Sequence, residues 1–302
     1  MRTTVGSVGL TGPIMTASGT AGHGAELGAY FPLADLGAVV VKSLSAAPWL
    51  GNPAPRLHPV RGGMLNSVGL QNPGVDAWVR DELPALERAG AKVVVSIWGF
   101  SVADYAAAAD AIGRCESRSI IAVEVNLSCP NVEDRRTMFA HDAARAAEAI
   151  SATAGCNRPR WAKLSPNVTD VTDIAGAVLD AGADGVTLVN TVMGLALDPA
   201  TGRACLGNGG GGLSGAAIHP VAVRAVFDVR AAFPDSPIVG VGGVVDGHGA
   251  AELLAAGANA VQVGTATFAD PRAPVRIQRE LAEWCAQLGV ESVTELIGRA
   301  HA

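Results

Sequence analysis

Short apolar runs rich in Val, Ile and Ala recur along the chain, and most are followed by an Ala-rich stretch with helical spacing. The runs lie at 14–17, 38–42, 92–97, 121–126, 161–164, 185–190, 238–241 and 260–264. Helical stretches are expected at 76–89, 102–113, 141–154, 171–181, 216–233, 249–256 and 275–288. Runs that are apolar on both faces are typical of buried parallel strands. The pattern predicts a single domain over 1–302, an α/β (β/α)8 TIM barrel with short insertions over its C-terminal mouth, with a doubly wound sheet as the alternative.

Composition excludes several other classes of protein. Hydrophobic residues make up 49% of the 302 residues, enough for a large core, and the net charge of −6 with scattered Lys and Arg argues against nucleic-acid binding. No apolar run reaches the roughly 18 residues of a membrane helix, and the N-terminus has no signal-peptide pattern, so we expect a cytoplasmic protein. The five Cys are odd in number and widely spaced, which argues against a disulfide framework or a metal site: 115, 129, 156, 205 and 285.

Polar residues end four of the predicted strands: Lys42, Asn126, Lys163 and Asn190. The C-terminal ends of all strands in such a barrel meet at one mouth, where the active site lies. A single Lys or Asn there is an ordinary solvated cap. Four of them, together with Ser96, favour a polar pocket at the mouth.

The stretch Glu124-Val-Asn-Leu-Ser-Cys-Pro-Asn131 carries the strongest chemical signal. Its apolar run ends in two amides and in the thiol of Cys129, which can accept or give a proton. Pro130 stops the strand at a defined place. A strand followed by an ordinary Asn-Pro turn with a small buried Cys would have the same sequence pattern. The stretch alone therefore does not decide between a reactive thiol in a polar pocket and a purely structural turn.

Glycines end the last two predicted strands, in Val239-Gly-Val-Gly-Gly-Val-Val245 and Val261-Gln-Val-Gly-Thr265. Barrels often bind phosphate at this position, where backbone N–H groups can approach the anion. Together the two motifs indicate a phosphorylated cofactor, most simply flavin mononucleotide (FMN), beside which Lys163 would stabilise a reduced ring. The Gly-rich segment 207–215 is expected to be a flexible loop that ends at the pocket, and the loop 62–74 offers N–H groups for a carboxylate.

These motifs occur in a particular order that covers about residues 4–290. It includes Ala17-Ser-Gly19, Lys42-Ser43, Met64-Leu-Asn-Ser-Val-Gly-Leu-Gln-Asn-Pro-Gly74, Asn126-Leu-Ser-Cys-Pro-Asn131 and Gly211-Gly-Leu-Ser-Gly215. The chain thereby closely resembles the class 1 dihydroorotate dehydrogenases, and its last motif is more similar to the 1B subclass than to 1A.

The resemblance implies an FMN enzyme of pyrimidine (UMP) synthesis that oxidises dihydroorotate to orotate, with Cys129 as the catalytic base. It implies that the substrate is bound by Lys42, Asn66, Val68, Gly69, Leu70, Asn126, Asn131, Asn190 and Thr191. It implies that FMN is bound by Ala17, Ser18, Gly19, Lys42, Ser43, Ser96, Asn126, Lys163, Val189, Ser214, Gly215, Gly242, Gly243, Gly264 and Thr265.

A 1B-like chain would form a homodimer and pass electrons to NAD through a partner subunit that carries FAD and an iron–sulfur cluster. A 1A-like chain would use fumarate without such a partner. Three further alternatives remain open at this stage: a pyrimidine-base reductase of the dihydropyrimidine dehydrogenase kind, a phosphate-binding lyase or isomerase without flavin, and an inactive flavin-binding scaffold.

This sequence departs from the family pattern at three places. Trp98 stands where a small residue is usual, and it either presses on the pocket or fills the core. His219 replaces a usual Lys, and the segment 132–137 after Cys129 is unusually charged.

Overall fold

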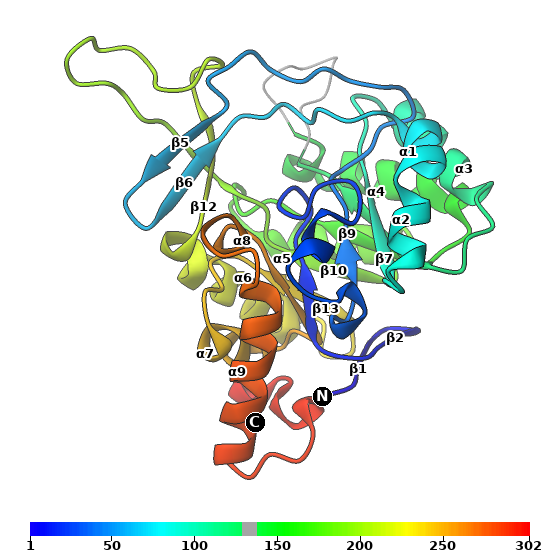
Figure 1. Ribbon diagram of the computed structural model, residues 1–302, viewed down its shortest axis with the longest axis vertical. Helices are drawn as coiled ribbons and strands as arrows, with labels where there is room; N and C mark the ends of the chain where they lie inside the picture. Colours follow the sequence, from blue (N-terminus) through cyan, green and yellow to red (C-terminus); the bar gives the residue numbers. More distant parts are fainter. Residues whose placement is uncertain (129–137) are drawn as a thin grey trace.

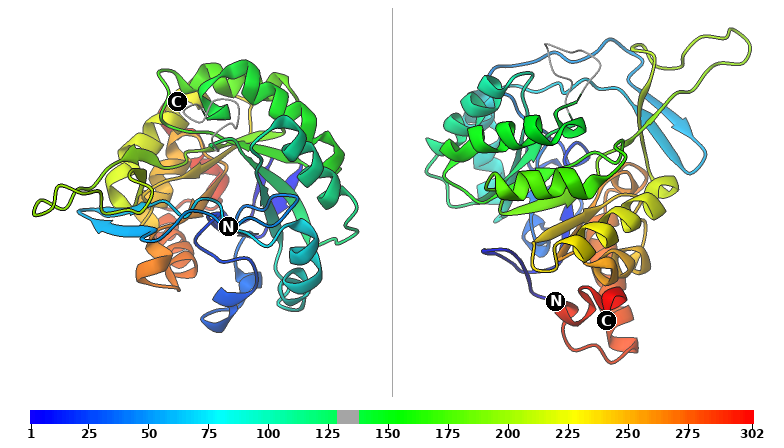
Figure 2. Two further views of the ribbon diagram at one scale, coloured as in Figure 1. Left: turned by 90° about the horizontal axis from the view of Figure 1, so that it is seen from above. Right: turned by 180° about the vertical axis from the view of Figure 1, so that it is seen from behind.

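The computed structural model describes residues 1–128 and 138–302. Its centre is an eight-stranded parallel sheet in the order β3-β14-β13-β10-β9-β8-β7-β4, closed into the barrel that is seen end-on in Figure 2. The strands are β3 (Ile14–Thr16), β4 (Val39–Val40), β7 (Val93–Ile97), β8 (Ile120–Asn126), β9 (Arg160–Lys163), β10 (Gly185–Leu188), β13 (Ile238–Val241) and β14 (Ala260–Val263). The predicted (β/α)8 barrel is confirmed, with a strand at each predicted run.

Helices surround this sheet on the outside (Figures 1 and 2). They are α1 (Val75–Asp81), α2 (Leu83–Arg88), α3 (Val102–Gly113), α4 (Ala143–Ala152), α5 (Val171–Asp180), α6 (His219–Ala232), α7 (Gly247–Ala256), α8 (Ala266–Ala269) and α9 (Ala273–Gln287). Short polar side chains set several of the starting points: Ser101 and Asp104 form a capping box on α3, and Asp246 accepts a hydrogen bond from Gly249 N on α7. After β3 the chain makes only the 3-10 turns η1 (Glu26–Ala29) and η2 (Leu33–Asp35) before β4.

Two predictions about local structure were wrong. The single helix expected over 76–89 is divided into α1 and α2 at Glu82, because Pro84 lacks an N–H and its ring would clash with the carbonyl of the preceding turn. The segment 207–215 is not simply a flexible loop, because its end forms strand β12 (Gly211–Ser214). Close packing explains its glycines: a Cβ at Gly212 would clash with the side chain of Thr191.

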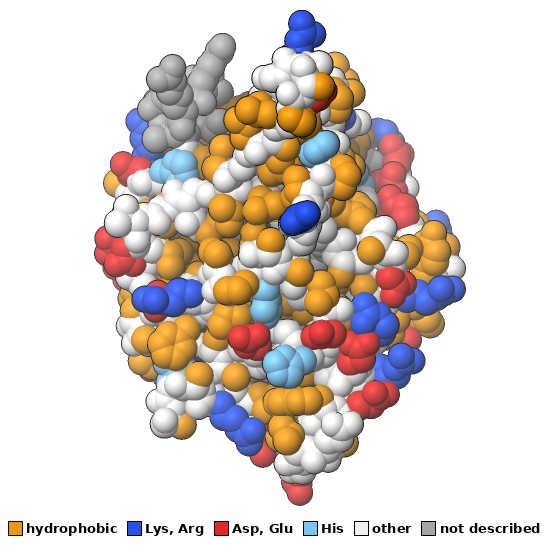
Figure 3. Space-filling model, turned by 90° about the vertical axis from the view of Figure 1, so that its left-hand side faces the viewer, with side chains coloured by type: hydrophobic (Ala, Val, Ile, Leu, Met, Phe, Trp, Pro, Cys, Tyr) orange, Lys and Arg blue, Asp and Glu red, His pale blue; other side chains and the backbone are white. Residues whose placement is uncertain are grey.

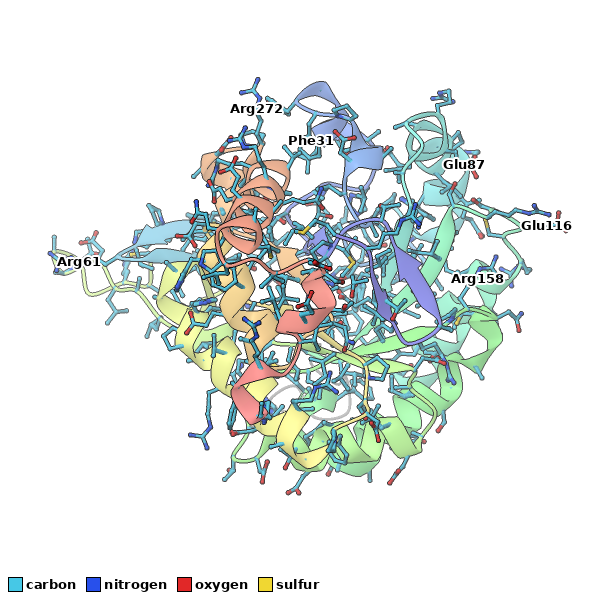
Figure 4. The ribbon with its side chains drawn as sticks, turned by 90° about the horizontal axis from the view of Figure 1, so that it is seen from below. Phe31, Arg61, Glu87, Glu116, Arg158 and Arg272 are labelled. Atoms are coloured by element: carbon cyan, nitrogen blue, oxygen red, sulfur yellow. The ribbon has the colours of Figure 1, made fainter. Side chains whose placement is uncertain are left out.

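Strand β12 belongs to a four-stranded antiparallel sheet beside the barrel mouth. Its order is β11-β12-β6-β5, with β5 at Leu57–Val60, β6 at Gly63–Asn66 and β11 at Val192–Gly194. Between β11 and β12 the chain leaves the barrel as a long ribbon, called the arm here (residues 195–210), which projects at the upper left of Figure 1. Figure 4 shows Arg61, at the turn between β5 and β6, pointing away from the barrel on the same side.

The opposite end of the barrel is covered by a hairpin of β1 (Thr3–Val5) and β2 (Val8–Leu10), visible from below in Figure 4. Its buried Val5, Val8 and Leu10 pack in one cluster with Met15 and Trp161 from inside the barrel. The barrel interior at this end is therefore packed with apolar side chains. Among the described residues no helix is long and apolar enough to cross a membrane.

The barrel closes between its first two strands through a side chain. The hydroxyl of Thr16 accepts from Val40 N at 2.8 Å and lies 3.2 Å from Val40 O, to which it can donate. Few regular backbone hydrogen bonds join β3 to β4, because β4 has only two residues and the pairing of Met15 with Ala38 is an isolated parallel bridge. Thr16 thus replaces ladder hydrogen bonds that this seam lacks.

We predict that Thr16→Val lowers the free energy of unfolding by about 1–3 kcal/mol, because Val has the same shape but leaves the buried N–H and carbonyl of Val40 without a partner. Urea unfolding followed by circular dichroism measures the change. Thr4→Val on the exposed face of β1 is the matched control, with an expected change within about 0.5 kcal/mol. Equal losses in both variants would show that Thr16 does not hold the seam.

Candidate functional site

A cavity of about 530 Å³ opens at the C-terminal mouth, between the barrel and the antiparallel sheet. The structure brings together there nearly all the described residues that the sequence predicted for cofactor or substrate: Ala17, Ser18, Gly19, Lys42, Ser43, Asn66, Val68, Gly69, Leu70, Asn126, Lys163, Val189, Asn190, Thr191, Ser214, Gly215, Gly242, Gly243, Gly264 and Thr265. They come from widely separated parts of the chain, so a single binding site is built from the ends of many strands.

The floor of the cavity holds a buried cation. Lys163 ends β9, and its ammonium Nζ lies 3.2 Å from Glu124 Oε1, 3.3 Å from Gln262 Oε1 and 3.2 Å from Ser18 Oγ. Lys163 has few carboxylates near it in the sequence, but the barrel places Glu124 of the adjacent strand β8 beside it. Sequence inspection missed this partner because Glu124 sits inside an otherwise apolar run.

One wall of the cavity is a chain of amides and hydroxyls. Asn190 Nδ2 donates to Asn126 Oδ1 at 3.1 Å, and Asn126 Nδ2 lies 3.4 Å from the Ser43 hydroxyl. Behind it, Ser43 Oγ is 2.9 Å from Ser96 Oγ. Ser96 is fully buried and stands one layer below the cavity surface, so it supports Ser43 where the sequence had predicted a direct contact with the cofactor.

The loop after β6 is held rigidly over the cavity. Asn66 Nδ2 donates to Gly212 O at 3.1 Å, and Asn72 fastens the far end by donating to Leu70 O at 2.9 Å and accepting from Gly74 N. Between them Gly69 and Leu70 have φ of 72° and 63°. This conformation is uncommon for a Leu and points to a functional constraint on the backbone at 68–70.

Glycines form a cradle at the ends of β13 and β14. Gly243 has φ of 69°, and a Cβ there would lie 2.6 Å from the Cβ of His219, the first residue of α6. The loop therefore rests directly on a helix N-terminus, where the dipole and the N–H groups favour an anion. Thr265 donates to Ser214 Oγ at 2.7 Å on the other side. This arrangement fits a phosphate group.

His219 supports the cradle from behind. Its Nδ1 is 2.8 Å from Gly242 O, a carbonyl that can only accept, so Nδ1 carries a proton. Its Nε2 lies 3.1 Å from Glu252 Oε2. The position that departs from the family pattern is thus occupied by a side chain that still fixes the glycine loop.

An aromatic group that sequence reasoning missed forms the outer wall. Trp49 and Phe100 line the cavity with ring centroids 5.0 Å apart, and both pack edge-to-face on Trp98. Trp98 is only 1% exposed, so it fills the core behind the wall. Trp49 and Phe100 lie in loops whose sequence shows no periodicity, and their neighbouring positions only become apparent in three dimensions.

Two predicted residues, Cys129 and Asn131, lie outside the described residues, as does the charged segment 132–137. The described chain reaches Ser128, which lines the cavity and whose N–H donates to Asn126 Oδ1 at 3.2 Å. The roles of Cys129 and Asn131 stay predictions.

A sequence profile of the family described as dihydroorotate dehydrogenase matches residues 1–285. This chain belongs to that family. A relative from Geobacter sp. (strain M21) is 44% identical over 99% of this chain and 97% of its own length, and one from Desulforudis audaxviator is 45% identical over 100% and 98%. Both are named dihydroorotate dehydrogenase B (NAD⁺), catalytic subunit, as is a relative from Alkaliphilus metalliredigens at 42% identity over 99% and 98%.

We predict that Gly243→Ala destabilises the fold by at least about 1 kcal/mol more than Gly202→Ala does. Both glycines have φ near 70°, so an Ala at either position is destabilised by the same left-handed backbone conformation. Of the two, only a Cβ at position 243 would have other atoms within 4 Å, those of His219. Urea unfolding of the two variants isolates the contact with His219. Equal destabilisation would mean that the cradle can move away from the helix.

Burial lowers the pKa of His23, which lies near Lys42; the positive charge of Lys42 contributes, and Glu26 opposes the shift. The folded chain therefore holds this imidazole neutral, while the unfolded chain protonates it near pH 6.5. The stability that this neutral imidazole allows is fully present above that pH, and it is lost as the pH falls from there toward the lowered pKa of the folded chain.

We thus expect the free energy of unfolding to fall less steeply from pH 7 to pH 5 in His23→Gln than in the wild type. Urea unfolding at several pH values measures the slope, and His248→Gln, which removes an exposed imidazole, is the matched variant. An unchanged slope in His23→Gln would contradict the assignment.

Proposed function

We propose that this chain is a dihydroorotate dehydrogenase catalytic subunit that oxidises (S)-dihydroorotate to orotate, with FMN as hydride acceptor, in pyrimidine synthesis. One observation carries the proposal: a single cavity combines a phosphate cradle, a buried cation, a wall of amides and a rigid loop suited to an anion. The chain's membership of the family supports the same assignment.

The cradle and the floor fit the two ends of FMN. Gly242, Gly243, Gly264 and Thr265 would hold its phosphate, since the three glycines have no side chain to keep an anion away from the backbone N–H groups and Gly243 rests on the N-terminus of α6. Lys163 would lie beside the ring, and Ala17, Ser18 and Ser43 would contact it. When bound, FMN supplies a two-electron acceptor that the side chains of this protein do not offer.

The remaining polar groups of the cavity suit a small cyclic amide with one carboxylate. Asn126, Asn190, Asn66 and Thr191 present amide and hydroxyl groups that can pair with the ring amides of dihydroorotate. Lys42 and the backbone at 68–70 would hold the carboxylate, because a cation and successive N–H groups both favour an anion. The internal hydrogen bonds of this wall fix the side chains before substrate arrives, which reduces the cost of binding.

The reaction requires removal of a proton from C5 and of a hydride from C6, which together leave the new double bond of orotate. We assign the proton to Cys129, whose thiolate would accept it, and FMN would accept the hydride. Support for this assignment comes from the sequence Asn126-Leu-Ser-Cys-Pro-Asn131 and from Ser128, which lines the cavity directly before the Cys.

We further propose that electrons leave to NAD through a second subunit carrying FAD and an iron–sulfur cluster, and that the catalytic chain forms a homodimer. The relatives' names support an NAD-linked enzyme with more than one subunit. Large apolar side chains also remain exposed on the antiparallel sheet and the arm: Leu57, Met193, Leu195 and Leu197. Figure 3 shows many hydrophobic side chains on the surface of the molecule. Apolar surface of this kind is typical of contacts between chains.

We expect the purified chain to bind FMN, and dihydroorotate to bleach the flavin absorbance in an anaerobic titration. A flavin band that stays oxidised with dihydroorotate would contradict the proposed substrate. Reoxidation by NAD⁺ only in the presence of a copurified second chain supports the proposed partner, whereas reoxidation of the isolated chain by fumarate would overturn it.

The same titration tests the base. Cys129→Ala should bind flavin normally but lose at least about 100-fold in the rate of its reduction, as expected when a general base is removed. Cys115→Ala, at the end of α3, is the matched control and should reduce at the wild-type rate. Wild-type reduction in Cys129→Ala would exclude this residue as the base.

A further inference from the structure

Glu124 is a fully buried carboxylate that the mechanism does not use. It lies on β8 two residues before Asn126, and because side chains alternate along a strand both residues point into the barrel. Its Oε1 is 3.2 Å from Lys163 Nζ, and its Oε2 accepts from Gln262 Nε2 at 2.7 Å. Both oxygens of this carboxylate are therefore occupied by donors from the two strands β9 and β14.

The ammonium of Lys163 is fixed from three sides. It has three protons, and three acceptors surround it: Glu124, Gln262 and Ser18. Lys163 and Ser18 line the cavity, while Glu124 and Gln262 lie below it, each with 0% exposure. A ring bound in the cavity can take over the contact with Ser18, whereas the two contacts from below continue to hold the ammonium in place.

The charges of this group have a direct consequence for redox chemistry. Glu124 and Lys163 form an ion pair with side chains only 0% and 5% exposed, so water screens their fields weakly. A flavin ring beside Lys163 becomes more negative when it is reduced, and it is then stabilised by the ammonium and destabilised by the carboxylate. The potential at the ring depends on the difference between the two.

We infer that Glu124 is a positioning residue that, together with Gln262, holds the Lys163 ammonium under the cofactor and sets the reduction potential of the bound flavin. The inference rests on the proposed function, because it requires FMN in this cavity. The carboxylate keeps the floor of the site electrically neutral overall, and it thereby limits how strongly Lys163 favours the reduced flavin.

The test is the midpoint potential of the bound flavin, measured anaerobically against a reference dye. Glu124→Gln keeps the size of the side chain and removes its charge, so we expect the equilibrium to shift at least tenfold toward reduced flavin, which is about 30 mV for a two-electron couple. Glu124→Asp keeps the charge but withdraws it by one methylene, and should shift the equilibrium in the same direction by a smaller factor.

Two controls isolate the interaction. Glu148→Gln removes an equal charge from the exposed face of α4 and should leave the potential unchanged. In a Lys163→Met background, Glu124 has no ammonium left to hold in place, so adding Glu124→Gln should shift the flavin equilibrium by a smaller factor than it does in the presence of Lys163. A purely structural role for Glu124 would not depend on Lys163 in this way.

The outcomes are distinct. The inference would be overturned if Glu124→Gln and Glu148→Gln had the same flavin potential. It would also be overturned if Glu124→Gln shifted the potential equally in the wild type and in the Lys163→Met background. Either result would leave the proposed function intact. If Glu124→Gln does not fold, the flavin potential of Glu124→Asp is the test. A potential equal to that of the wild type would then overturn the inference. Wild-type protein that binds no flavin would overturn the proposed function, and this inference with it.

Discussion

The parallel direction of all eight barrel strands is the constraint on which the rest of the structure depends. It requires every connection to cross outside the barrel, and it places every strand's carboxyl end at the same mouth. Side chains 145 residues apart, such as Lys163 and Ser18, therefore meet in one hydrogen bond. At the other end of the barrel, apolar side chains of the strands and of the hairpin of β1 and β2 pack together, so the polar groups described here gather at the mouth.

The division of the barrel interior into an apolar lower half and a polar upper half is also an energetic requirement. A lone ammonium buried at the position of Lys163 would lose its hydration without compensation. Glu124 and Gln262 supply the missing partners, so the cation can remain beneath a cavity that water leaves when a ligand enters. Removing one member of such a pair costs more than the pair contributes, because the other charge is left buried and unpaired.

The sequence pattern was sufficient to predict the barrel and its eight strands, and about half of the residues that line the cavity were predicted from this pattern together with the family resemblance. The reason is physical: a parallel strand is a continuous apolar run, and where it ends, the first polar residue must lie at the mouth. Lys42, Asn126, Lys163 and Asn190 were found by this rule alone. The glycines at the ends of β13 and β14 were predicted from their position after the last two strands, and the structure adds the reason for Gly243, where the contact with His219 leaves no room for a side chain.

What the sequence could not provide were contacts between strands and between loops. Glu124 was passed over because its partner Lys163 is 39 residues away, and only the register of β8 against β9 brings the two side chains together. The wall of Trp49 and Phe100 depends on two irregular loops, which have no period to identify a buried face. Pro84, which causes the break between α1 and α2 at Glu82, was visible in the sequence, but the helical pattern on both sides of it hid the interruption.

The glycines of β12 show how one local feature joins the cavity to the surface. Because Gly212 has no side chain, β12 can lie against Thr191 at the cavity edge and pair with β6, which carries Asn66. The same strand continues outward into the arm and its exposed Leu195 and Leu197. A change in the position of the arm would thus reach the Asn66 loop through only one strand pairing. The exposed apolar side chains of the arm and the loop that follows Asn66 are thus attached to neighbouring strands of one antiparallel sheet, and the lack of a side chain at Gly212 is what lets these strands meet at the edge of the cavity.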